Sequence, residues 1–491
     1  MSAEKIVHTS FAILPFTVRS SGVADTGLFN GFVTKVTGAL KPMVNQNTAS
    51  IVDTTRYHGY IKNYLSSGEE REAAFLQSYP ITQAFFEGRL KSQADKSDKP
   101  FAYHPQKHVL KVVNKESNHA WKVEFLKSSY LVLNQFCEIG YFVLGFDFNH
   151  VDIQSMIAFR DCEFFRYAHN SHSKHSLHVY SNKGTSDGSV ATLTVFELLE
   201  FLFPELLCNL YFIGQDTEQE NPENDRGKIK PVLLHLIKAF DISKYIDTNT
   251  GIQEYFFDLL RIRRIKSECY SEPIKSMKSD MVHGTMVGAL NEGAVVMDFL
   301  EGNASNPLLI YKYLPAFLFA LNQRQTMVYV NQRISAIKES DISNIDQKVI
   351  EKFKAMKKEI DILHLKQVFF TISFNDEVSD FYQKIQKAFQ INLHLEDNKE
   401  SVKELYSFLE ESRLDRESRE QAIRDSWMNS ILAGIGCLGI FGFFKDFFPF
   451  WEDKTPWSFL HQGAHLYKWV GSLLPLVLAG YLVFVIRKNI K

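Results

Sequence analysis

The chain has 491 residues, a formal net charge of −2 and five cysteines, and these figures exclude several classes of protein. Its length allows two or three structural units with a sizeable core. The near-neutral charge and the lack of a long basic run in the sequence argue against nucleic acid as a direct partner. The cysteines form no CxxC pair, so the sequence indicates neither a disulfide framework nor a structural zinc site and suits a reducing cytosol.

The first half of the chain predicts a domain of mixed strands and helices. Short segments rich in β-branched and aromatic residues are bounded by turn formers, which is typical of strands. These segments are SFAILPFTV, HVLKVVN, WKVEFLKSSYLVL, GYFVLGFDF and SLHVYS. The segment TLTVFELLEFLFPELLCNLYFIG indicates a buried helix that is interrupted at Pro204. We therefore expect an α/β domain over residues 1–342, in a protein of the α+β class.

Two basic clusters in this domain are candidates for binding an anionic ligand, because the arginine fork suits phosphate groups. The first cluster is RIRRIK and the second flanks DCEFF; their members are Arg261, Arg263, Arg264 and Lys266, and Arg160 and Arg166. The alternative for the first cluster is a solvated helix face after YFFDLL.

Four histidines, His169, His172, His175 and His178, recur at every third position. Such spacing brings imidazoles together on a metal only in a helix or a 3-10 turn. Serine and asparagine fill the gaps and strand-like text follows, so a solvated loop is favoured over a zinc site. The sequence thus leaves any bound metal unknown.

From about Ser343 the sequence becomes helical in character, and we expect a helical region with a stalk helix over residues 343–427. Helix-favouring residues carry apolar positions at three-to-four spacing, and no proline or glycine occurs between Glu396 and Gly434. The apolar stripe of this stalk fades toward its end, so the stalk either bundles with other copies around an axis or packs on this chain's own preceding helices.

Two apolar stretches near the end, MNSILAGIGCLGIFGFF from Met428 and WVGSLLPLVLAGYLVFVI to Ile486, predict a two-helix transmembrane hairpin over residues 428–491. Each is long enough, as a helix, to cross a bilayer core of roughly 30 Å. Aromatic residues mixed with charges in the connector are typical of a headgroup boundary. The alternative is a buried helical hairpin.

Basic residues predict the orientation of this hairpin. Arg416, Arg419 and Arg424 precede the first stretch, and Arg487, Lys488 and Lys491 follow the second. We therefore expect a multi-pass protein of the inner membrane with both termini in the cytoplasm.

This order of parts resembles the CorA family of divalent-cation transport proteins, which have a cytosolic α/β domain, a stalk helix, two C-terminal spans and a basic tail. The family reads GIYGMN at the end of the first span. Here Gly439, Ile440, Phe441 and Gly442 match, whereas Phe443 and Phe444 stand where Met and Asn would be. The missing Asn removes an oxygen ligand for a hydrated cation.

We expect one face of the first stretch and the phenylalanines at its end to line a pore. The residues are Asp425, Met428, Leu432, Ile435, Gly439, Gly442, Phe443 and Phe444. Asp425 could form a carboxylate ring and the phenylalanines a hydrophobic constriction. The alternative is that the small residues of this stretch only pack it against the second one.

The resemblance extends to divergent CorA-like effectors of type III CRISPR antiviral defence. This chain is similar to them in lacking the Asn of the motif and in having an enlarged cytosolic domain. It implies a homo-oligomeric, pentameric membrane channel, not an enzyme, whose cytosolic domain senses a nucleotide second messenger such as a conjugate of S-adenosylmethionine and AMP. A housekeeping transporter of magnesium or another divalent cation is one alternative. A membrane-tethered enzyme or binding module is the other.

Overall fold

The computed structural model forms two compact units: residues 1–336 with 360–399, and residues 337–359 with 400–491. Residues 360–399, which the sequence assigns to the helical region, thus group with the first unit. The structure describes residues 7–20, 23–24, 26–44, 57–58, 65–66, 76–82, 85–89, 108–117, 119–125, 129–134, 137–148, 159, 162–165, 174–181, 189–203, 210–213, 231–238, 281–282, 285–291, 293–298, 306–335, 354, 357–358, 372–452, 477 and 481.

The first unit is built on one mixed sheet, in which the described residues form 15 strands. Two long antiparallel strands lie at its centre, β1 (Val7–Ser20) and β8 (Ile139–Phe148). On the far side of β1 follow β12 (Val232–Lys238), β15 (Gly293–Asp298), β14 (Thr285–Leu290) and β13 (Met281–Val282), and β12 and β15 are parallel. Beyond β8 follow β6 (Ala120–Phe125), β5 (His108–Asn114), β9 (His175–Ser181) and β10 (Ser189–Leu193).

The sheet branches because β1 and β8 are longer than their neighbours. The start of β8 pairs with β7 (Ser129–Asn134), which continues to β4 (Leu76–Ile81) and β3 (Leu65–Ser66). The end of β1 pairs with β11 (Leu210–Phe212) and β2 (Val23–Ala24). The apolar segments expected to be strands are therefore strands, and they converge on these two central ones.

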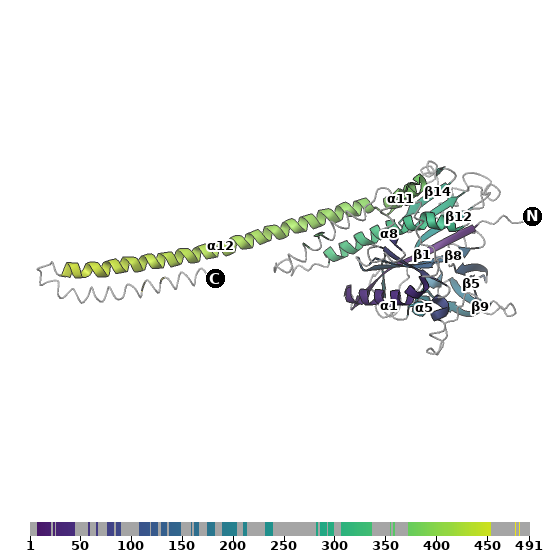
Figure 1. Ribbon diagram of the computed structural model, residues 1–491, viewed down its shortest axis with the longest axis horizontal. Helices are drawn as coiled ribbons and strands as arrows, with labels where there is room; N and C mark the ends of the chain where they lie inside the picture. Colours follow the sequence, from purple (N-terminus) through teal and green to yellow (C-terminus); the bar gives the residue numbers. More distant parts are fainter. Residues whose placement is uncertain are drawn as a thin grey trace, which may run out of the picture. The chain divides into compact units, whose positions relative to one another are not determined.

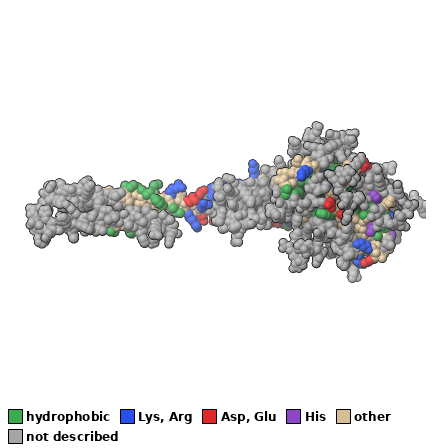
Figure 2. Space-filling model, turned by 90° about the horizontal axis from the view of Figure 1, so that it is seen from below, with side chains coloured by type: hydrophobic (Ala, Val, Ile, Leu, Met, Phe, Trp, Pro, Cys, Tyr) green, Lys and Arg blue, Asp and Glu red, His purple; other side chains and the backbone are tan. Residues whose placement is uncertain are grey.

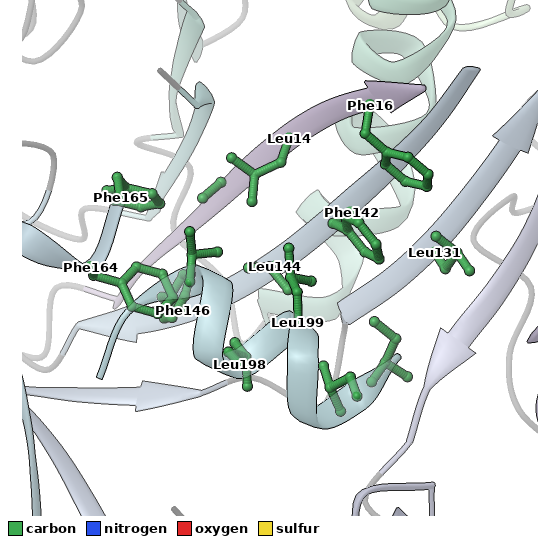
Figure 3. Close-up of a cluster of buried hydrophobic side chains, with 14 of the residues drawn as sticks. Leu14, Phe16, Leu131, Phe142, Leu144, Phe146, Phe164, Phe165, Leu198 and Leu199 are labelled. Carbon is green, nitrogen blue, oxygen red and sulfur yellow. The ribbon is translucent and has the colours of Figure 1, made fainter. Parts of the chain in front are cut away.

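One face of the sheet holds the main hydrophobic core. Alternate residues of β1 and β8 pack there with α1 (Thr26–Val44), α5 (Val195–Leu202) and the 3-10 turn η2 (Glu163–Phe165). Figure 3 shows phenylalanines and leucines of β1, β8, η2 and α5 meeting in this cluster. The α5 helix starts at a capping box formed by Thr194 and Glu197 and ends at Leu202, before Pro204. Pro204 itself lies outside the described residues, and Leu210–Phe212, which the sequence assigned to the same buried helix, form strand β11 instead.

The opposite face of the sheet is covered by α8 (Asn306–Ser335) and α11 (Asp376–Ala388). Figure 1 shows α1 and α5 on one side of the central strands and these two helices on the other. Strand side chains alternate between the two faces, so β1 presents Phe11 and Ile13 toward the α8 side and Ala12 and Leu14 toward the main core. Both sets are fully buried.

A single helix, α12 (Ile391–Glu452), runs through the residues expected to form the stalk and the first transmembrane stretch. Its residues 391–399 belong to the first unit and its remainder to the second. In its described side chains beyond residue 402, nearly every position is exposed or half-buried. Figure 2 shows charged side chains along one length of α12 and hydrophobic ones along the next.

The predicted transmembrane hairpin is contradicted. No helix in the described residues is long and apolar enough to cross a membrane. Side chains of the first stretch are described only as far as Gly439, and charged residues such as Arg424 and Asp425 precede the stretch. The second stretch lies outside the described residues apart from Val477 and Tyr481. The fold class of a CorA-like membrane protein, the inner-membrane location and the channel are corrected accordingly.

Candidate functional site

A run of polar residues is buried inside the apolar helix α8, in the segment LFALNQRQTMVYV. Asn322 and Thr326 have no exposed surface, and Gln323 and Gln325 have almost none. Buried amides are costly unless they are hydrogen-bonded, so their partners show what this part of α8 holds together. Those partners come from the sheet, from α11 and from the start of α12. We call the place where they meet the junction.

Toward the sheet, Asn322 is the central acceptor. Its Oδ1 accepts hydrogen bonds from Nδ2 of Asn134, at 2.9 Å, and from the hydroxyl of Tyr141, at 3.0 Å. One turn further along α8, the Thr326 hydroxyl lies 3.5 Å from Sγ of Cys137. These contacts fix the rotation and the register of α8 on β7 and β8, because an apolar face alone would allow the helix to slide.

Toward the other helices, the same segment holds α11 and α12. Nε2 of Gln386 in α11 donates to Oε1 of Gln323 at 3.0 Å. Nδ2 of Asn398, in the third turn of α12, donates to the carbonyl of Met327 at 3.2 Å. Asn398 is fully buried, and Ile391 and Leu395 of α12 pack in the interior as well. The beginning of α12 is therefore part of the core of the first unit.

The turn between α11 and α12 is a left-handed corner. Gln390 has φ of 53°, a region that side-chain-bearing residues rarely adopt, and its neighbour Phe389 is buried. The Phe389 ring packs edge-on against Phe317 of α8, with ring centroids 5.9 Å apart. Tertiary packing by Phe389 thus holds Gln390 in this conformation and sets the direction in which α12 begins.

Arg324 of α8 completes the junction. Its guanidinium lies over the Phe389 ring, 5.0 Å from the centroid, and Nη1 donates to the carbonyl of Asn291 in the β14–β15 turn at 2.7 Å. Burial lowers the pKa of Arg324 from its ordinary value. The junction therefore joins a sheet turn, α8 and the α11–α12 corner through one positively charged side chain.

A second polar cluster lies on the main-core face, where β1 meets β12. The Ser10 hydroxyl is 2.7 Å from Nδ1 of His235 and 3.0 Å from Nε2 of His8. All three side chains are buried, and burial followed by the nearby His235 lowers the pKa of His8 well below its ordinary value. The two imidazoles share this hydroxyl, and Nδ1 of His8 has no hydrogen-bond partner among the described residues. The described residues contain no group of side chains that could hold a metal ion.

On the opposite face of the same strands, the Thr9 hydroxyl donates to Oδ1 of Asp147 at 2.7 Å. Burial is the main cause that raises the pKa of Asp147, and nearby Glu124 adds to it. Asp147 and Glu124 are cross-strand partners, and Glu124 in turn pairs with Lys122 at 2.6 Å. This row is a partly exposed line of charged and polar side chains on the sheet.

The structure places few of the residues singled out from the sequence at a site. All six candidate ligand-binding residues, Arg160, Arg166, Arg261, Arg263, Arg264 and Lys266, lie outside the described residues, as do His169 and His172. His175 and His178 belong to strand β9 and not to a loop; His178 lies in SLHVYS, the segment that the sequence predicted as a strand.

The residues expected to line a pore all lie in α12. Asp425, Met428, Leu432, Ile435 and Gly439 are exposed, whereas for Gly442, Phe443 and Phe444 only the helical backbone is described. Sequence reasoning missed the whole junction. One signal was available: the polar run Asn322–Gln325 interrupts a largely apolar part of α8, from Leu314 to Val330.

No family model, no curated protein and no solved structure matches this chain. The resemblance to the CorA family therefore stays a prediction.

Proposed function

We propose that this protein is a homo-oligomer that transmits a signal from its α/β unit into the helix α12. In this proposal the junction holds the start of α12 in a direction set by the sheet and α8. The exposed apolar side chains further along α12 pair with those of other copies. The protein would act by binding and rearrangement and not by catalysis.

The apolar surface of α12 is the observation on which this proposal depends. Met428, Ile431 and Ile435 follow one another at intervals of three and four residues, the spacing of a coiled-coil seam. Ile431 is 50% exposed and Ile435 59% exposed. Burying a side chain of this size stabilises an assembly by about 1.5–3 kcal/mol, so a few such positions on each helix suffice for association.

Continuity of the helix supports the transmission step. The α12 helix has no break between the buried Asn398 and the exposed Ile435. Two buried acceptors at the junction, Oδ1 of Asn398 in α12 and Oε1 of Gln325 in α8, have no hydrogen-bond partner among the described residues. Each such group costs about 1–3 kcal/mol, so a rearranged junction that satisfied them would compete with the present one. The signal we propose is the nucleotide second messenger that the family resemblance implies.

Light scattering and sedimentation of the full chain test self-association. We expect a defined oligomer, which the double change Ile431→Glu with Ile435→Glu shifts to smaller species because charges cannot be buried in the seam. Asn429→Glu, which adds a charge at an exposed position on another face of the same helix, is the matched control and should leave the mass unchanged. A wild-type chain that is monomeric at every concentration, or an unaffected double variant, contradicts the proposal.

A further inference from the structure

Arg324 is a cation for which the described chain supplies no anion. Its interactions in the structure are the Phe389 ring and the Asn291 carbonyl, and it forms no ion pair with any described residue. By contrast, Lys312 of the same helix is paired with Glu377 of α11. Arginine carries five N–H donors, so one bond to a carbonyl leaves most of its fork unused.

The environment of Arg324 favours an anion at this place. The guanidinium is only half-buried, so a small ligand can reach it, yet its burial makes an uncompensated charge costly. The Phe389 ring restrains the guanidinium at this place, and the donors that do not bind the Asn291 carbonyl suit the two oxygens of a phosphate or carboxylate group. Lys387, in the last turn of α11, is exposed and adds positive charge to the same corner.

We propose that Arg324 anchors a binding site for a small oxyanion, the phosphate or carboxylate group of a free ligand, at the junction. The planar fork binds two oxygens of that group, and Phe389 holds the fork in place. Phe389 directly precedes Gln390, the corner residue from which α12 starts. An oxyanion bound to Arg324 therefore alters the packing of Phe389 and, through it, the conformation of this corner. Only this last consequence rests on the proposed function; binding itself does not.

Titration calorimetry on the full chain tests the site, with pyrophosphate and citrate as probes at constant ionic strength. We expect saturable binding of at least one probe, and the two arms distinguish a phosphate site from a carboxylate site. Arg324→Gln should weaken binding roughly 10- to 100-fold, since a charged hydrogen-bonding partner is lost. Arg324→Lys keeps the charge but not the fork, so its affinity for the probe should lie between those of Arg324→Gln and the wild type.

Arg89 provides a matched control, because it also lies over a phenylalanine, Phe85, with the guanidinium carbon 5.3 Å from the ring centroid. Arg89→Gln should leave the affinity for the probe unchanged. If circular dichroism shows that Arg324→Gln does not fold, the probe is titrated against Arg324→Lys and Phe389→Leu instead. Both should bind it more weakly than the wild type. Failure of the wild type to bind either probe saturably, or equal affinity in the folded Arg324 variants, overturns the assignment.

The oligomeric mass of the same samples separates this inference from the proposed function. A chain that binds the probe and stays monomeric refutes the oligomer and keeps the site. A chain that forms the oligomer and binds neither probe refutes the site alone.

Discussion

The helices α8 and α12 differ in which side chains they bury: α8 buries polar ones, whereas α12 exposes apolar ones. Within α8, amides such as Asn322 are buried beside phenylalanines, and neighbouring elements supply their hydrogen bonds. Along residues 403–436 of α12, isoleucines are as exposed as the arginines and glutamates around them. What surrounds a helix, and not its average composition, therefore decides which of its groups are satisfied. The apolar groups of α12 require a partner that the described part of this chain does not provide.

The largest expected effect comes from the apolar side of α8. Phe317→Ala removes a fully buried ring that packs on Phe389 and should lower the free energy of unfolding by about 3–5 kcal/mol. Leu414→Ala, at an exposed position of α12, should change it by no more than about 0.5 kcal/mol. Urea unfolding followed by near-ultraviolet circular dichroism measures both. Similar losses in the two variants would remove the contrast between the helices.

The polar side of α8 should be nearly as sensitive. Asn322→Leu deprives Nδ2 of Asn134 and the hydroxyl of Tyr141 of their shared acceptor, which should cost about 2–4 kcal/mol. The control is Gln383→Leu, an amide replaced at an exposed position of α11. The same unfolding experiment compares them. A neutral Asn322→Leu variant would show that shape alone positions α8.

Acidification should weaken the first unit through His8. Because the folded pKa of His8 lies below that of the unfolded chain, the unfolded state takes up the proton first. The stability is complete above about pH 6.5 and is lost as the pH falls below it, by no more than about 1.4 kcal/mol per pH unit for one group. His8→Phe should flatten this dependence, measured as urea midpoints between about pH 7.5 and 5.

Asp147 acts in the opposite direction to His8. Its folded pKa is raised, so the native state binds the proton first and acidification relieves its cost. Asp147→Asn should therefore make the acid loss steeper, whereas His8→Phe reduces it. Parallel curves for wild type and His8→Phe would show that other groups carry the acid sensitivity.

The smallest effect belongs to the charged length of α12. Nε of Arg416 lies 3.1 Å from Oε1 of Glu420, and both side chains are well exposed. Such pairs contribute about 0.3–0.5 kcal/mol, so Arg416→Gln should be barely detectable in urea unfolding at low salt and undetectable at high salt. A loss above about 1 kcal/mol would mean that this length of α12 is buried in the assembly.

Local patterns in the sequence predicted individual elements well. The segment GYFVLGFDF became β8, Pro204 followed the end of α5, and the stretch without proline or glycine after Glu396 lies in one helix. The branching of the sheet was out of reach, because β1 finds its partners far along the chain. Gly140 illustrates this, since a Cβ there would lie 2.1 Å from the Phe16 ring across the strand pair.

The site was harder to predict than the fold, for a physical reason. Arginine clusters and regular histidine spacing attract attention in a sequence, yet the junction uses isolated amides whose partners come from four distant segments. Asn322 and Asn134 are 188 residues apart, so no local spacing could reveal them. The length of the apolar stretch after Met428 led to a wrong prediction of a membrane-spanning helix. No helix in the described residues is long and apolar enough to cross a membrane.

The central position of β1 has a consequence for how this chain is made. The strand is synthesised before its neighbours: Asp147, which binds Thr9, follows 138 residues later, and His235, which contacts Ser10, follows 225 residues after that serine. At about 5–20 residues per second, β1 emerges roughly 10–45 seconds before its second neighbour, β12, has been synthesised. The pairing of β1 on both sides therefore cannot be complete until β12 has been synthesised.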